Sequence, residues 1–163
     1  LQKSKAIQNS LAQLPELDSH HEIFQHLLKF NRIGFDRLYK DCHVGLKISP
    51  VMCDAFTQKN FSLKNVQQSE VYQTDLTKKT LLHYAAAGGC DLNSALMKRR
   101  LVEPLLCLQD ENGLSALMIC AMRGDFCNCQ ALIKEKELLD AQGRSAAEVA
   151  RQAGFARIAK MLQ

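Results

Sequence analysis

The sequence has no tryptophan, few prolines and no uninterrupted apolar stretch of the roughly 18 residues that a membrane-spanning helix needs. It also has no large excess of one charge, since 21 Lys and Arg residues stand against 17 Asp and Glu, a formal net charge of +4. This balance is too small to demand a polyanionic partner such as nucleic acid. Over 163 residues, 47% hydrophobic and 23% charged side chains predict one soluble domain or two small ones and argue against wholesale disorder.

A secretory signal is also missing, because no basic segment followed by an apolar one opens the sequence. Leu1 is neither an initiator methionine nor the small residue left after its removal, so we expect a piece of a longer chain. The seven cysteines are odd in number and irregularly spaced. They favour reduced thiols over a disulfide framework, and therefore a cytoplasmic or nuclear protein.

The sequence offers no clear catalytic or metal-binding constellation. The strongest zinc candidate would combine Cys127 and Cys129 with Cys42 and His43. Its spacing is unfavourable, because residues i and i+2 of a helix point about 200° apart. Glu22 and His26 share a helical face, but no third ligand is evident nearby. We therefore expect no metal, no cofactor, no small-molecule substrate and no enzymatic activity.

Three segments of the C-terminal half resemble one another. They begin at Asp75, Asp110 and Asp140, and each continues through a polar turn into a helix-start signal. A hydroxyl residue that can cap the first free N–H groups of a helix follows each turn, and a glycine suited to a left-handed conformation ends that helix. The capping residues are Thr80, Ser115 and Ser145, and the glycines are Gly89, Gly124 and Gly154.

A second helix is predicted after each glycine. In the second segment Phe126, Cys129, Leu132 and Ile133 have the spacing of one buried stripe, and Phe155, Ile158, Met161 and Leu162 repeat it in the third. Small residues such as Ala85, Ala86, Cys120 and Ala121 are expected to let neighbouring helices approach closely. The predicted unit is a turn, a short helix, a reversal and a longer helix.

These residues resemble ankyrin repeats. The run Thr80-Leu81-Leu82-His83-Tyr84-Ala85-Ala86 is similar to the family's T-P-L-H-x-A-A run, and Asp110-Glu-Asn-Gly113-Leu-Ser115-Ala116-Leu117 is similar to its D-x-x-G-x-T-P-L run. The later repeats also resemble ankyrin repeats common in certain protists, some of which accompany kinase domains. The resemblance covers residues 75–163 and implies an all-α solenoid of stacked helix-turn-helix units.

Two departures from the family pattern affect the first turn and the family histidine. Lys78 stands where the family has a turn glycine, so the first turn is expected to be shaped differently. The histidine is present only as His83, and Met118 and Glu148 take its place in the later units. Whether those two units keep the helix-start hydrogen bond is left open.

Three regions follow from these patterns. Residues 1–61 are predicted to be a helical N-terminal region, either degenerate repeats or a separate cap, with helix starts at Ser19 and at Ser49-Pro50. Residues 62–74 are polar and rich in glutamine, so they are predicted to be a loop or linker. Residues 75–163 are expected, from the resemblance, to form three ankyrin-like repeats, of which the last serves as the C-terminal cap.

The resemblance implies a non-catalytic protein-protein interaction module that holds another protein, with no nucleic acid or membrane as partner. The alternative is a regulatory or substrate-recruiting domain of a larger enzyme such as a protein kinase or ubiquitin ligase. Met122, flanked by Arg123 and Leu114, is either an apolar contact point or simple packing against the next repeat. The family's variable contact positions correspond to Lys79, Glu111, Asn112, Leu114, Met122, Arg123, Gln142, Arg144 and Gln152.

Overall fold

The computed structural model describes residues 47–58, 60–63, 66–92 and 100–163. Within these ranges the chain is mostly helical, and its β-type pairings are three isolated bridges, so the all-α prediction is confirmed there. The helix start predicted at Ser19 and the residues Glu22, His26, Cys42 and His43 lie outside the described residues.

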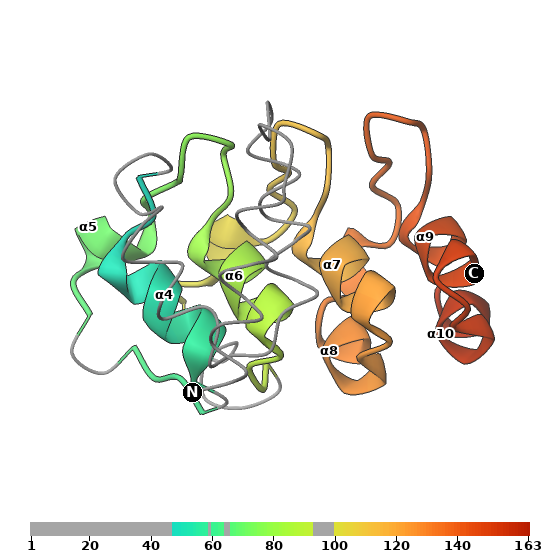
Figure 1. Cartoon of the computed structure of the whole chain (residues 1–163), viewed down its shortest axis with the longest axis horizontal. Coiled ribbons are helices and arrows are strands. Elements are labelled where there is room, and N and C mark those ends of the chain that lie inside the picture. Colours follow the sequence, from blue (N-terminus) through green and yellow to red (C-terminus); the bar gives the residue numbers. More distant parts are fainter. Residues whose placement is uncertain (1–46, 59, 64–65, 93–99) are drawn as a thin grey trace, which may run out of the picture.

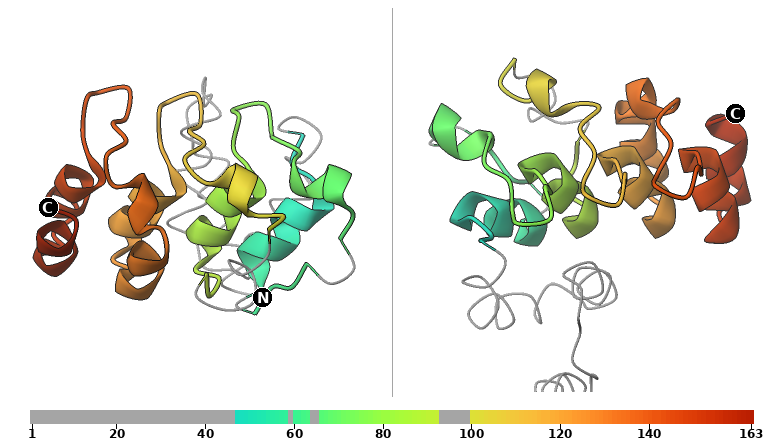
Figure 2. Two further views of the ribbon diagram at one scale, coloured as in Figure 1. Left: turned by 180° about the vertical axis from the view of Figure 1, so that it is seen from behind. Right: turned by 90° about the horizontal axis from the view of Figure 1, so that it is seen from above.

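Four helices lie side by side in one row, with the connecting turns projecting on one side (Figures 1 and 2). Along the row α4 contacts α6, α6 contacts α7, and α7 contacts α9, while α8 packs on α7 and α10 on α9. The elements are α4 (Pro50–Thr57), α5 (Gln68–Val71), α6 (Leu81–Gly88), η1 (Glu103–Leu105), α7 (Ala116–Arg123), α8 (Phe126–Ala131), η2 (Ile133–Glu135), α9 (Ala146–Gln152) and α10 (Ala156–Met161).

The predicted helix start at Ser49-Pro50 is confirmed by α4. The Ser49 side chain accepts a hydrogen bond from the Met52 amide, and Pro50 occupies the first turn, where its missing N–H costs nothing. Met52 and Ala55 are fully buried, and Phe56 is nearly so. This apolar side places α4 against α6.

Within the segment 62–74, predicted to be a loop or partly ordered linker, the structure describes one short helix and two buried residues. Residues Gln68–Val71 form the short helix α5, and the backbone N–H of Gln67 donates to the Glu70 carboxylate at 2.9 Å. Leu63 and Val71 are buried in the core. The polar composition of the segment gave no indication that Leu63 and Val71 are buried, or that Gln67 and Glu70 form a capping hydrogen bond at the start of α5.

The three predicted hydroxyl caps are all present. Thr80, Ser115 and Ser145 each accept a hydrogen bond from a backbone N–H in the first turn of α6, α7 and α9 respectively. Gly89 and Gly124 end α6 and α7 in the left-handed conformation. In the third unit α9 ends one residue earlier, at the cap Ala153, and Gly154 carries the positive φ.

The first turn has the same backbone conformation as the other two, contrary to the expectation from Lys78. Lys78 has a φ of 64°, close to the 72° of Gly113 and the 74° of Gly143. The geometry of the turn is therefore imposed by its hydrogen bonds, and the lysine adopts a conformation that only glycine reaches without strain.

Replacing Lys78 with glycine is expected to stabilise the chain by about 0.5–1 kcal/mol, because relief of the left-handed strain exceeds the added chain entropy of glycine. Urea denaturation followed by circular dichroism measures the change. Lys78→Ala is the matched control, since it removes the same exposed side chain and keeps the strain. Equal stabilities of the glycine and alanine variants would contradict the prediction.

The apolar stripes predicted for the second helices are buried in the structure except at their ends. Cys129 and Leu132 are fully buried, but Ile133 is 39% exposed because α8 ends at Ala131 and the chain tightens into η2. In the last unit Ile158 and Leu162 are buried, whereas Phe155 is 37% exposed.

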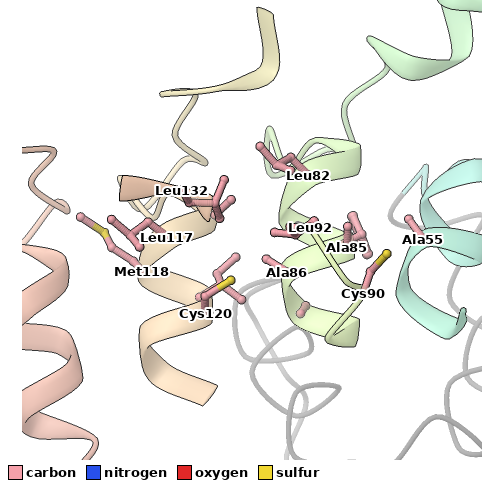
Figure 3. Packing of buried hydrophobic residues seen from close by; sticks show 14 of the residues in the cluster. Ala55, Leu82, Ala85, Ala86, Cys90, Leu92, Leu117, Met118, Cys120 and Leu132 are labelled. Carbon is pink, nitrogen blue, oxygen red and sulfur yellow. The ribbon is translucent and has the colours of Figure 1, made fainter. Parts of the chain in front are cut away.

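The core is continuous along the row. Small side chains lie where helices approach, among them Ala55 on α4, Ala85 and Ala86 on α6, and Cys120 on α7 (Figure 3). Leucines supply bulk between these contacts, and Leu82 and Leu117 are almost completely buried. Each helix therefore buries its apolar side against its neighbours in the row, as expected for units that cannot fold alone.

Candidate protein-binding surface

The turns 75–79, 110–114 and 140–144, called here the turn row, share one construction. Each begins with an aspartate whose Oδ1 accepts hydrogen bonds from the backbone N–H groups two and four residues later. In the first turn Asp75 accepts from Thr77 and Lys79, both at 2.8 Å. Asp110 and Asp140 repeat this pair of bonds at 2.9 Å in the second and third turns.

Backbone hydrogen bonds also join each turn to the next. The Glu111 N–H donates to the Thr77 carbonyl at 3.0 Å, and the Ala141 N–H donates to the Asn112 carbonyl at 2.9 Å. The turns therefore lie in register and project to the same side of the helices (Figure 1). The result is one continuous strip that crosses all three units.

The exposed side chains of the turn row are a mixture of polar, charged and apolar groups. Glu111 and Gln142 are exposed and Asn112 is half-buried, as a contact role requires. Leu76 at 46% exposure and the exposed Lys78 extend the strip over the first turn. Sequence reasoning missed these two, although Leu76 occupies the same turn position as Glu111.

Lys79 and Leu114 are buried, so their predicted role as surface contact residues is wrong. Lys79 has no exposed side-chain surface, and its Nζ lies 2.9 Å from Asp110 Oδ2 and 2.9 Å from Thr77 Oγ1. Leu114 is only 4% exposed and belongs to the core. Lys79 turns inward to pair with Asp110 of the next turn, and Leu114 packs in the hydrophobic core.

Met122 and Arg123, at the end of α7, differ in burial: Met122 is half-buried and Arg123 is exposed. Met122 is half-buried against the core, and the Arg123 guanidinium donates to the Ala87 carbonyl near the end of α6. Arginine there also complements the negative end of the α6 dipole. Leu114 belongs to the core and Met122 packs against it, so the packing alternative describes these two residues, whereas Arg123 keeps an exposed side chain.

Arg144 and Gln152 form a polar link across the third unit. Arg144 binds Asp140 Oδ2 through Nε at 2.8 Å and Nη2 at 2.7 Å, and donates from Nη1 to Gln152 Oε1 at 2.8 Å. Burial works to raise the pKa of Asp140, but the hydrogen bonds from Arg144 and Gln142 prevail and lower it. Gln152 itself remains exposed beside this pair.

His83 acts at the start of α6, as predicted. Its Nδ1 accepts from the Thr80 backbone N–H at 3.1 Å, and its Nε2 lies 3.0 Å from the Leu114 carbonyl in the next turn. In the third unit Glu148 supplies the helix-start bond, accepting from the Ser145 N–H at 2.8 Å. That bond lowers the pKa of Glu148, and Met118 leaves the second unit without an equivalent side-chain acceptor.

Glu135 is a buried structural residue that sequence reasoning missed. Its Oε1 accepts from the Cys107 N–H at 3.1 Å and its Oε2 from the Leu117 N–H at 2.9 Å. Burial raises the pKa of this carboxyl above its usual value. The equivalent position one unit earlier is the apolar Leu105, so register gave no signal for a buried acid.

The described residues contain no group of three or more His, Cys, Asp or Glu side chains placed to hold a metal ion. Burial raises the pKa of the Cys129 thiol to about 12 and that of Cys120 well above its ordinary value. Both are therefore protonated core residues rather than activated nucleophiles. Among the same residues, none belongs to a helix with the length and apolar character needed to cross a membrane.

No protein-family model matches the chain, and no curated protein matches it.

Proposed function

We propose that residues 75–163 form an ankyrin-like solenoid whose turn row binds another protein, without catalysis. The main support for this proposal is the alignment of the three turns. Backbone hydrogen bonds join each turn to the next, so side chains from three units lie along one strip. Behind the first turn, α6 is buried over its whole length and offers no exposed side chain. A rigid strip with varied side chains is the arrangement by which stacked-repeat proteins hold partners.

The contact set that follows differs from the one suggested by the sequence. It keeps Glu111, Asn112, Gln142 and Gln152, adds Leu76 and Lys78, and omits Lys79 and Leu114 because they are buried. It also keeps Arg123, which is exposed, while the half-buried Arg144 holds Gln152 in place.

The test changes the charge of exposed side chains in the turn row and leaves the backbone hydrogen bonds between the turns in place. Glu111→Arg combined with Gln142→Arg changes two exposed turn side chains. Glu103→Arg combined with Gln130→Arg is the matched control, because it makes the same two exchanges at exposed positions on η1 and α8. Partners crosslinked to the wild-type chain in cells are quantified by mass spectrometry for each variant, and thermal melts check that all three fold.

We expect the turn-row variant to lose at least about tenfold of the specific partner signal, as for residues at the centre of an interface, while the control retains it. Equal recovery of the same partners by both variants would remove the turn row as the binding surface. A parallel loss by both would also contradict the proposal, since it would place binding elsewhere.

A further inference from the structure

The second turn of the turn row contains the pair Asn112–Gly113, which is the only Asn-Gly pair in the chain. The corresponding pairs are Thr77–Lys78 in the first turn and Gln142–Gly143 in the third. An asparagine before a glycine can modify itself, because glycine has no side chain to shield its backbone nitrogen from the asparagine side chain. The second turn therefore carries a chemistry that the other two lack.

The reaction closes a ring within the backbone and needs only base and water. The Gly113 nitrogen loses its proton to base and attacks the side-chain carbon Cγ of Asn112. The bond from Cγ to Nδ2 breaks, and Nδ2 takes up a proton and leaves as ammonia, so that a cyclic imide remains. Water then opens the imide. Opening at Cγ gives aspartate, and opening at the backbone carbon gives isoaspartate, in which the main chain continues through the former side chain.

In the closed turn the peptide unit between Asn112 and Gly113 is hydrogen-bonded at both ends. Its N–H donates to the Asp110 carbonyl at 2.9 Å, and its C=O accepts from the Ala141 N–H of the third turn at 2.9 Å. A hydrogen-bonded amide is protected from losing its proton to base, which is also the chemical step of hydrogen exchange. The first step of the reaction is therefore blocked while these bonds hold.

The shape of the turn opposes ring closure as well. A turn closed by a bond from Gly113 to Asp110 holds the ψ angle of its third residue, Asn112, near about 0°. The planar imide cannot form at that angle, because the Gly113 nitrogen is then aligned with the Asn112 nitrogen and turned away from Cβ. The Asp110 carboxylate adds to the constraint, since its Oδ1 accepts from the Asn112 and Leu114 amides at 2.9 Å.

We propose that Asn112–Gly113 is a site of spontaneous modification, which the closed turn row holds inactive and which converts to isoaspartate or aspartate when the second turn opens. Because the reaction is slow compared with local opening, its rate is the open fraction multiplied by the rate in the unfolded chain. The site does not depend on the turn row having a partner, and only its effect on binding rests on the proposed function.

Conversion to isoaspartate makes the opening of the turn permanent. The backbone carbonyl that accepts from the Ala141 N–H becomes a free carboxylate, and the main chain between Asp110 and Gly113 gains one carbon atom. The second turn can then no longer close on Asp110 and present an acceptor to the third turn in the same arrangement. Both products also add a negative charge beside Glu111, an exposed residue of the turn row.

The rate of conversion is measured on the whole chain at pH 8, both native and unfolded in guanidinium. Trypsin releases the segment 101–123, in which Asn112 is the only asparagine, and mass spectrometry follows the replacement of its amide by a carboxyl group. We expect the native chain to convert at least about tenfold more slowly than the unfolded chain. Equal rates would overturn the proposal, and so would an absence of conversion in the unfolded chain.

Asp110→Ala tests whether the second turn itself controls the rate, because it removes the carboxylate that fixes this turn. Asp75→Ala is the matched control, since Asp75 Oδ1 makes the same pair of bonds in the first turn. We expect Asn112 to convert at least about threefold faster in Asp110→Ala than in Asp75→Ala. Equal rates in the two variants would contradict control by the second turn.

If either variant does not fold, hydrogen exchange of the wild-type chain decides the question. Loss of the Gly113 amide proton and conversion of Asn112 then require the same opening. The protection of the Gly113 amide is therefore expected to match the ratio of the unfolded and native conversion rates within about tenfold. A larger discrepancy would separate the reaction from the opening of the turn and overturn the proposal.

The structural consequence is tested on the isoaspartate form, purified by chromatography and identified by electron-transfer fragmentation. Asn112→Asp is the matched control, because it adds the same charge without lengthening the main chain. We expect the protection of the Ala141 amide, measured by NMR, to fall by about tenfold in the isoaspartate form, as for the loss of one backbone hydrogen bond, and to be retained in Asn112→Asp. Equal protection in both would show that isoaspartate does not separate the second turn from the third.

Discussion

Gly88→Ala is expected to destabilise the chain by at least about 3 kcal/mol, because it places a methyl group inside a backbone contact. Gly88 is the buried last residue of α6, and a Cβ built there lies 1.9 Å from the Phe56 carbonyl oxygen and 2.5 Å from its carbon. A backbone carbonyl cannot rotate aside as a side chain does. Accommodation therefore requires α4 to move away from α6, which breaks the packing between these helices (Figure 3).

Gly143→Ala separates this clash from the general cost of replacing a glycine. A Cβ at Gly143 meets no atom within 4 Å, so its cost is the left-handed strain alone, about 1–2 kcal/mol. Guanidinium denaturation followed by circular dichroism gives both free energies of unfolding. If Gly88→Ala proves no more costly than Gly143→Ala, the close approach of α4 and α6 is wrong.

Sequence reasoning predicted the local features because their causes are local. A hydroxyl before a helix and a glycine after it act within a few residues, and Thr80 and Gly89 do so in α6 as expected. The same reasoning failed at Lys78, where the aspartate bonds of the turn override the residue's own preference. No local pattern marks Gly88 as a required glycine, since the residue that it contacts, Phe56, lies 32 positions earlier in α4.

The candidate site was predicted less well than the helices. The repeat pattern shows which position of the turn a residue occupies, but it does not show whether that side chain is exposed or buried. Lys79 has the register of a contact residue, yet the next turn presents Asp110 to it and draws the side chain inward. Glu111, the second residue of its turn, stays exposed. Leu114, which occupies the position of Lys79 in the second turn, is buried as well. This turn position therefore faces inward in both units, which the sequence spacing alone did not indicate.

Lys79→Met is expected to cost about 3–5 kcal/mol, because it leaves the Asp110 carboxylate buried without its cation. Both side chains have no solvent exposure, and Nζ lies 2.9 Å from Asp110 Oδ2. Methionine keeps most of the length and the apolar stem, so the loss is chiefly electrostatic. The Thr77 hydroxyl also loses the lysine that donates to it at 2.9 Å. Urea denaturation at pH 7 measures the change.

A double-mutant cycle with Asp110→Asn distinguishes the ion pair from the packing of the two side chains. The asparagine oxygen can still accept from the Asn112 and Leu114 amides that define the second turn, so the turn is preserved while the charge is removed. We expect Lys79→Met with Asp110→Asn to cost less than the sum of the single changes, with a coupling of at least about 1 kcal/mol. Additive costs would mean that the two groups do not depend on each other. The turns 75–79 and 110–114 would then be held together by packing and by the hydrogen bond from His83 to Leu114. The burial of Lys79 would have no electrostatic explanation.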